Sequence, residues 1–356
     1  MTENADAQHL NSHDSPNGDS TMRSLTLAQA WNGFLMDKRA SGKSPYTLRN
    51  YANTMHKLQL YLSAVLHTDG SRLMLRDLDH AFWVRFFAWI QEGEFAPGGV
   101  VGGRTARHLS AKTIRNYHTD FSAFYTWAVK LGCATVHLIA NVERPDYERP
   151  LIDLLTEADI KAMLIACDYT REWHNSHTAS KRQTAMRDRA IIMLLVSTGI
   201  RASELCGATR ADLDLDDNQL KVSGKSRGRA PKQRIVHFGK RTRRAMWRYL
   251  VEYAELPPEA PLFPADVVVD PRPMSRRGLD TLLKRIGERA GVKGVYPHRF
   301  RHTFAVNYLL NGGDSLALKR ALGHASLKMV DHYVQLASSD LAAIQRTADP
   351  ADNWNL

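Results

Sequence analysis

The segment YPHRFRHTFAVNYLLNGGDSLALKRALGHASLKMVDHYVQLA, residues 296–337, places His298, Arg301, His302, His324 and Tyr333 in one short run. His298 and Arg301 are three residues apart, so a helix that begins at Pro297 would project both from one face. Proline is favoured in the first turn of a helix, and Gly312-Gly313 is a strong helix break. The pattern therefore predicts a helix, a glycine turn and a second helix.

A third helix is predicted at the end of this segment. Leu327, Val330 and Val334 mark its buried side, and Tyr333 lies beside that apolar stripe. A single tyrosine beside such a stripe is usually a core or edge residue, and a single histidine is usually just hydrogen-bonded. The joint pattern of histidines, arginine and tyrosine is much harder to explain by packing alone.

The order His-x-x-Arg-His, then Leu-Gly-His, then a tyrosine nine residues later resembles the tyrosine recombinase (phage integrase) family. Upstream, residues 198–205 look like the family's first-arginine box, and Gly224-Lys225-Ser226 looks like the hairpin turn that carries its lysine. These motifs span residues 152–340, with Phe300 where the family usually has leucine. The resemblance implies a mainly α fold with a small antiparallel β-sheet in the C-terminal domain, built as a two-domain DNA clamp.

By this resemblance, Tyr333 is the nucleophile that attacks a DNA phosphodiester. Arg201 and Arg301 would bind the phosphate oxygens, because arginine stays protonated and offers a planar two-pronged donor. Fixed cations aimed at the charge that builds in the transition state lower the barrier. Glu204 is expected to hydrogen-bond within the site without taking part in the chemistry.

A phenol with a pKa of about 10 is almost wholly neutral at pH 7, so Tyr333 needs nearby positive charge or a base. His298 is the better candidate for that base. His302 and His324 are expected to orient the phosphate or brace the pocket.

The predicted hairpin turn carries several cations. The Gly-Lys register assigns Lys225 to protonation of the leaving 5′ oxygen, and Arg227 and Arg229 in the same turn are expected to contact DNA. With a formal net charge of +11 for the whole chain, these clusters favour a polyanionic partner, double-stranded DNA.

At 356 residues with 44% apolar content, the chain is long enough for two domains with cores of their own. No apolar run reaches the roughly 20 residues that a membrane span needs, and the N-terminus lacks a signal-peptide pattern. We therefore expect no membrane association and a cytoplasmic location, in a bacterial cytoplasm or nucleoid. The three cysteines have no metal-ligand spacing and are expected to be reduced and buried.

The expected domain organisation is a disordered acidic tail at 1–21, a helical core-binding (SAM-like) domain at 22–142, a linker at 143–151, a catalytic domain at 152–340 and a C-terminal tail at 341–356 that contacts another protomer. Helical periodicity in the first domain predicts a four-helix bundle, with Ser44 and Ser110 at helix starts. Its candidate DNA contacts are Lys43, Arg49, Lys112 and Arg115.

In the second domain, Thr156 is the expected cap of a helix, and residues 168–186 are expected to form a loop or extended helix end. An apolar helix at 188–197 would deliver Arg201 at its end. Strands are predicted at 219–223 and 233–238, and helices at 241–253 and 275–290.

No cofactor is expected. Gly-Lys-Ser occurs at Gly42 and Gly224, but the glycine that a phosphate-binding loop needs five residues earlier is Asp37 and Gln219. No metal site is expected either, so the predicted strand transferase would work without metal or ATP.

Two other functions share part of this pattern. A helix-turn-helix regulator would account for residues 304–322 but not for Arg201, Lys225 and Tyr333 together. A type IB topoisomerase shares the chemistry but acts alone, whereas recombination needs a tetramer on two duplexes. A Xer-like resolver of chromosome dimers and an integrase of a mobile element have the same motifs.

Overall fold

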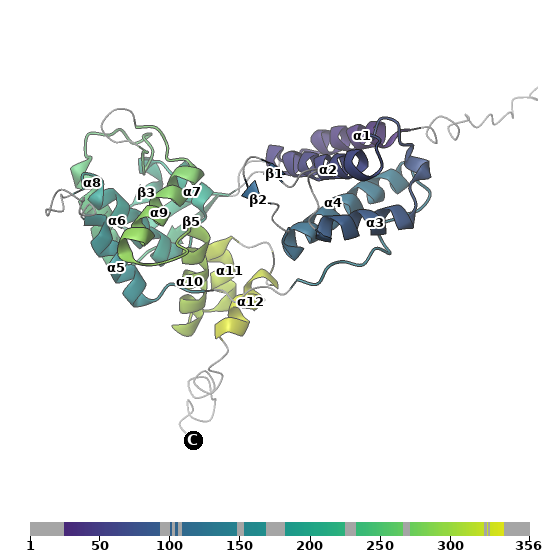
Figure 1. Cartoon of the computed structure of the whole chain (residues 1–356). Helices are drawn as coiled ribbons and strands as arrows, with labels where there is room; N and C mark the ends of the chain where they lie inside the picture. Colours follow the sequence, from purple (N-terminus) through teal and green to yellow (C-terminus); the bar gives the residue numbers. More distant parts are fainter. Residues whose placement is uncertain are drawn as a thin grey trace, which may run out of the picture. The chain divides into compact units, whose positions relative to one another are not determined.

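The computed structural model describes residues 25–92, 100–101, 104–105, 109–147, 153–168, 182–224, 233–265, 271–323, 326 and 328–337. The chain divides into two compact units, Met1–Arg149 and Pro150–Leu356. Figure 1 shows that both units are built mainly from helices, and the second also holds a three-stranded antiparallel sheet. The predicted fold class is therefore confirmed. The expected tails at 1–21 and 341–356 and part of the expected linker lie outside the described residues.

Four helices make up most of the described part of the first unit. They are α1 (Leu27–Ala40), α2 (Pro45–Val65), α3 (His80–Glu92) and α4 (Ala111–Lys130), with a short antiparallel pair β1 (Val100–Val101) and β2 (Arg104–Thr105). The expected starts are confirmed: Ser44 accepts a hydrogen bond from the Thr47 backbone, and Ser110 accepts one from the Thr113 backbone. Such caps satisfy backbone N–H groups that have no partner inside the helix.

The core of the first unit is aromatic. Trp83 of α3 and Phe121 of α4 have ring centroids 4.7 Å apart, and Trp31 of α1 lies 4.9 Å from Phe124. The Trp83 indole N–H donates to the Tyr125 hydroxyl at 2.9 Å, so this buried polar group is paired. The amphipathic faces that the sequence predicted meet in this core.

The second unit contains the remaining helices and the sheet, with strand order β3-β4-β5. Its elements are α5 (Glu157–Asp168), α6 (Ala185–Thr198), α7 (Ala202–Gly207), β3 (Leu213–Asp214), β4 (Gln219–Ser223), β5 (Gln233–His237), α8 (Lys240–Glu252), α9 (Arg276–Ala290), α10 (Pro297–Leu310), α11 (Ser315–Leu322) and α12 (Lys328–Ala337). Thr156 caps α5 as expected. The sequence did not predict β3, because two residues are too few for a visible alternation.

Helix α6 is central to the second unit and packs against α5, α8 and α10. Ile191, Ile192, Leu194 and Leu195 are all 0% exposed. A helix that is apolar on all sides is buried by its neighbours. It ends at Gly199, which has a left-handed backbone with φ of +57°. This sharp end brings Arg201 to the start of α7.

Two predictions about burial were wrong. On α12, Val334 is 36% exposed, whereas Tyr333 is only 5% exposed and packs with buried Val330. Residues three apart share the buried side of this helix, and Leu327 lies outside the described residues. All three cysteines are free as expected, but only Cys167 is fully buried.

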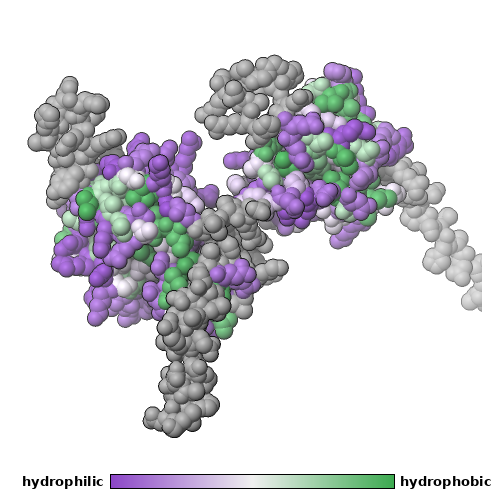
Figure 2. Space-filling view, turned by 60° about the horizontal axis from the view of Figure 1, so that its bottom comes forward, coloured by the Kyte–Doolittle hydropathy of each residue, from purple (hydrophilic) through white to green (hydrophobic). Residues whose placement is uncertain are grey.

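Hydrophilic side chains cover much of the described surface in Figure 2, with smaller apolar patches between them. None of the helices that the structure describes has the length and apolar content to cross a membrane.

Candidate active site

Three arginines converge on the C-terminal end of α11, where three consecutive carbonyl groups accept their hydrogen bonds. The donors are Arg234 Nε (2.8 Å to Ala321 O), Arg301 Nη2 (2.7 Å to Leu322 O) and Arg201 Nη2 (3.1 Å to Gly323 O). The last carbonyls of a helix have no donor within the helix and carry partial negative charge, so cations are stabilised there. The end of α11 thus fixes three guanidinium groups from α10, β5 and the α6–α7 corner.

Glu204 is the carboxylate that orients two of these arginines. Arg234 donates to both of its oxygens, at 2.7 and 2.9 Å, and Arg201 Nη1 donates to Oε1 at 2.9 Å. Burial alone would raise the pKa of Glu204, but the hydrogen bonds and charges of Arg234 and Arg201 bring that pKa below its ordinary value. Three guanidinium groups and one ionised carboxylate leave a net positive site.

Arg301 is the most enclosed of the three cations. Its side chain lies on α10 and is 1% exposed, and Nη1 donates to the Gly199 carbonyl at 2.9 Å. Burial, and after it the positive charge of Arg201, lower the pKa of Arg301 to about 10. Arg301 therefore remains protonated at neutral pH, with its charge fixed in a site of low polarity.

Tyr333 of α12 lies within electrostatic reach of both predicted phosphate-binding arginines. Burial raises the pKa of its phenol, and the charges of Arg301 and Arg201 partly offset that rise. Its hydroxyl is 2.9 Å from His302 Nδ1. The phenol is therefore neutral at pH 7, next to an imidazole that could exchange a proton with it.

His298 stands one helical turn before His302 on α10. Their ring centroids are 4.4 Å apart at an interplanar angle of 70°. His298 is exposed at the first turn of the helix, whereas His302 is half-buried. The structure thus brings Arg201, Arg301, Glu204, His298, His302 and Tyr333 into one site.

Several predicted site residues lie outside the described residues, namely Lys225, Arg227, Arg229 and His324. His324 directly follows Gly323, whose carbonyl accepts from Arg201. Gly323 has φ of +62°, and a Cβ there would lie 3.1 Å from Arg234 Nη1. Glycine in this Leu-Gly-His motif therefore serves both the backbone turn and the close approach of a guanidinium group.

The candidate DNA contacts of the first unit divide into two pairs. Lys43 and Arg49 are exposed on or before α2. Lys112 Nζ lies 6.0 Å from the Tyr147 ring centroid, and Arg115 Nη1 donates to the Pro145 carbonyl at 3.1 Å. The second pair therefore also contacts the segment that leads out of this unit.

From the sequence, Arg234 belongs to the basic cluster of the predicted hairpin, and it was not predicted as an active-site residue. In β5, Val236 is buried and the flanking Ile235 and His237 are exposed. Because side chains alternate along a strand, Arg234 shares the inward face with Val236. An arginine on the buried face of a strand was the signal available in the sequence.

Comparison with known proteins identifies relatives of both units. Residues 154–340 match the phage integrase family, and residues 30–143 match the phage integrase SAM-like domain. Tyrosine recombinase XerD of Xanthomonas axonopodis pv. citri is 29% identical over 321 residues, which cover 87% of this chain and 93% of the relative. Tyrosine recombinase XerC of Xylella fastidiosa (strain M23) is 30% identical over 251 residues, which cover 70% of this chain and 79% of the relative.

Several solved structures share the fold, among them the following two. A XerH site-specific recombinase bound to a palindromic difH substrate, in a post-cleavage complex, matches with a TM-score of 0.63 and 18% identity over 92% of this chain and 85% of its own. A lambda integrase dimer bound to a COC' core site matches with a TM-score of 0.61 and 16% identity over 86% of this chain and 97% of its own. From the family match over residues 154–340 and the curated relatives, the chain belongs to the phage integrase family, the tyrosine recombinases.

Proposed function

We propose that this tyrosine recombinase cuts and rejoins double-stranded DNA at specific sites through a covalent 3′-phosphotyrosine at Tyr333. The observation that carries the proposal is geometric: the Tyr333 hydroxyl lies 2.9 Å from His302 on α10, and Arg301 of the same helix and Arg201 both donate to the end of α11. These residues come from α12, the α6–α7 corner and α10, so only the folded unit brings them together.

In the proposed reaction, the Tyr333 oxygen attacks phosphorus while the bond to the 5′ oxygen breaks. The phenol proton passes to an imidazole, and the leaving 5′ oxygen takes a proton from Lys225, the role that the family resemblance gives it. A 5′-hydroxyl of another strand then attacks the phosphotyrosine and releases Tyr333. The phosphodiester energy is kept in the covalent intermediate, so ligation needs no ATP.

Arg201 and Arg301 would bind the non-bridging oxygens of the scissile phosphate. Both guanidinium groups are held in position before the substrate arrives. Glu204 and the end of α11 hold Arg201, and the end of α11 holds Arg301. Preorganised donors of this kind act where transition-state charge develops.

Two histidines are candidates for the proton acceptor. His298 was the candidate from sequence, and His302 is the imidazole 2.9 Å from the phenol oxygen. We propose that His302 receives the proton and that the neighbouring His298 supports His302 without accepting the proton itself. Replacing the true acceptor with alanine should slow cleavage by roughly 10²-fold or more and make the rate rise toward alkaline pH. His298→Ala should show a smaller loss without that pH slope.

The central experiment uses a suicide DNA substrate carrying the recombination site, resolved on a denaturing gel. Wild-type protein should form a covalent adduct, and Tyr333→Phe, which keeps the ring in its buried site, should form none. An adduct at normal yield with the phenylalanine variant would remove Tyr333 from the nucleophile role.

We infer that the DNA partner is held by both units, with the first unit acting as a core-binding domain through Lys43, Arg49, Lys112 and Arg115. We also propose a homotetramer in the synaptic complex and a location in the bacterial cytoplasm or nucleoid. The alternative, a type IB topoisomerase, would relax supercoiled DNA as a monomer. A helix-turn-helix regulator would bind the same DNA without forming any adduct.

The proposed tetramer needs a contact between protomers, and a groove of about 1020 Å³ on the second unit is its best candidate. Leu155, Ile160, Met193, Val196 and Phe304 give this groove an apolar lining, and Lys161, Lys240 and Arg241 lie along it. The C-terminal tail carries Leu341 and Ile344, three residues apart, and the acidic Asp340. We propose that this tail of one protomer occupies the groove of its neighbour.

A further inference from the structure

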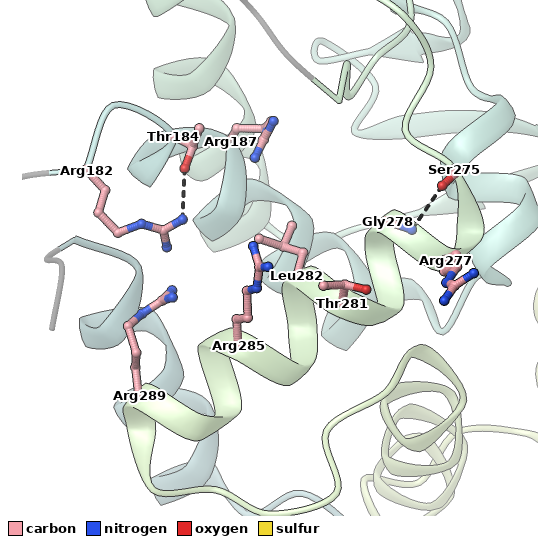
Figure 3. Close-up of a pocket in the computed structure, with 10 residues that line it drawn as sticks. All are labelled: Arg182, Thr184, Arg187, Ser275, Arg277, Gly278, Thr281, Leu282, Arg285 and Arg289. Atoms are coloured by element: carbon pink, nitrogen blue, oxygen red, sulfur yellow. Dashed lines mark hydrogen bonds between the residues drawn. The ribbon is translucent and has the colours of Figure 1, made fainter. Parts of the chain in front are cut away.

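A second cluster of arginines surrounds a pocket between α9 and the turn before α6. The cavity measures about 510 Å³, and none of its lining residues belongs to the active site. Five guanidinium groups line it: Arg182, Arg187, Arg277, Arg285 and Arg289. Figure 3 shows the side chains of Arg182 and Arg289 extending toward each other from the two sides.

The buried carboxylate of Asp188 partly neutralises this cluster. Asp188 is 0% exposed and pairs with Arg187 at 3.0 Å and with Arg182 at 3.1 Å. Arg187 Nη1 also donates to the carbonyls of Pro264 and Ala265, both at 2.9 Å. Arg187 is therefore a structural residue, fully engaged by the protein.

Arg182 and Arg289 keep unused donors. Arg182 Nη2 donates to the Thr184 hydroxyl, and Arg289 Nε donates to the Ala166 carbonyl at 3.1 Å. Within the part of the chain that the structure describes, the buried atoms Arg182 Nη1 and Arg289 Nη2 have no hydrogen-bond partner. Buried polar groups are almost always paired, so each orphaned N–H points to an acceptor other than the described residues.

Mutual repulsion is a second, separate sign. Burial lowers the pKa of Arg289, and the positive charges of Arg182 and Arg285 lower it further. A bound anion would relieve this repulsion and supply acceptor oxygens to both orphaned donors.

We propose that this pocket binds a phosphate group at a site separate from the catalytic one. A phosphate offers several oxygens to guanidinium groups that approach from different directions, which matches donors on α9 and on the turn before α6. The group could belong to the backbone of the bound duplex or to a free phosphorylated molecule. Either source uses the same orphaned donors.

The test compares variants of the full-length protein that remove one positive charge from α9. Arg285→Gln changes an exposed side chain of the pocket, and Arg289→Gln removes an orphaned donor. Lys284→Gln is the matched control, because Lys284 lies next to Arg285 on α9 but outside the pocket. Thermal unfolding of each variant establishes that it folds.

Two measurements distinguish the sources. If a backbone phosphate occupies the pocket, the slope of log affinity for duplex DNA against log salt becomes shallower by about 0.9 in the two arginine variants and stays unchanged in the control. If a free phosphate does, pyrophosphate raises the melting temperature of wild-type protein and Lys284→Gln but not of Arg289→Gln. Identical behaviour of arginine and lysine variants in both measurements would overturn the proposal. The Tyr333 adduct, assayed at low salt, should form in every variant, so this outcome is independent of the catalytic proposal.

Discussion

At the scale of single residues, the geometry of the active site depends on Glu204 and Arg234. Neither would touch the phosphate in the proposed reaction. Arg234 donates to both oxygens of Glu204 and to the end of α11, and Glu204 in turn orients Arg201. These residues act through Arg201, so we assign them a positioning role.

Replacing Arg234 with alanine should therefore reduce cleavage without removing any group from the reacting atoms. We expect a loss on the order of 10²-fold in adduct formation, the effect of misplacing a catalytic group by about 1 Å. Stability should fall by about 3 kcal/mol, because Glu204 would lose its bidentate partner inside the protein. Adduct kinetics and urea unfolding measure the two effects.

Lys221→Ala is the matched control for this variant, since it removes an exposed cation from the neighbouring strand β4. It should leave both quantities close to wild type. Arg234→Lys keeps the charge but not the two-pronged donor, so it should recover only part of the activity. Normal cleavage by Arg234→Ala would refute the positioning role.

The lowered pKa of Glu204 also predicts how stability depends on pH. A carboxyl whose pKa is lower in the folded than in the unfolded protein stabilises the fold at pH values above its unfolded pKa, about 4.3. That contribution is lost as the pH falls through the folded pKa. The stability difference between wild type and Glu204→Gln should therefore shrink below about pH 4.3. Urea unfolding at pH 6 and at a series of lower pH values measures it, and a constant difference would contradict the prediction.

Sequence motifs with fixed spacing predicted Arg201, Arg301, His298 and Tyr333 as site residues, and the structure brings these four residues together. Such motifs could not identify Arg234. The bond between Arg234 and Glu204 joins positions 30 residues apart, and that between Arg301 and Gly199 joins positions 102 apart. Local periodicity contains no information about such pairs.

At the scale of elements, the corner between α6 and α7 positions the site. Gly199 ends α6 in a left-handed conformation, and its carbonyl accepts from Arg301. The Phe304 side chain of α10 packs so closely that a Cβ on Gly199 would lie 2.6 Å from Phe304 Cδ1. The end of α6 can therefore approach α10 this closely only if residue 199 has no side chain.

Gly199→Ala should be destabilised by about 3 kcal/mol, the sum of backbone strain and overpacking. Cleavage should fall as well, because the carbonyl that fixes Arg301 would shift. Gly291→Ala is the matched control: this glycine has φ of +71° at the end of α9, but a Cβ there would meet no atom within 4 Å. It should cost only about 1 kcal/mol, from strain alone. Equal melting temperatures for the two variants would show that Phe304 does not restrict the corner.

Helix positions followed from the sequence more reliably than burial did. Capping residues and proline at the first turn marked the starts of α2, α4 and α10, which are local signals. The predicted buried side of α12 was wrong, because Tyr333 is buried whereas Val334 is exposed. Amphipathic patterning treats a tyrosine as polar, although its ring packs like a core residue and only its hydroxyl needs a partner.

At the scale of the whole molecule, each unit has its own core: the described core residues of the first lie between Leu27 and Val142, and those of the second between Leu155 and Tyr333. The described residues of the proposed active site all belong to the second unit. The two-domain division could be expected from length and from the proline-rich segment near residue 150. Assembly could not, since contacts between protomers leave no periodic pattern in one chain.

Deleting residues 338–356 should separate cleavage from assembly. The deletion leaves Tyr333 and the end of α12 in place, so a suicide substrate should still give the covalent adduct at near wild-type yield. The groove of a neighbouring protomer would lose its proposed occupant, so the slow-migrating complex of two duplexes should disappear from native gels. Ile344→Asp should reproduce this loss with a single change, because a charge is costly to bury in a groove lined by apolar side chains. Ser338→Asp adds the same charge outside the Leu341–Ile344 pair and serves as the control. A deletion that leaves both cleavage and the two-duplex complex unchanged would exclude the tail as the link between protomers.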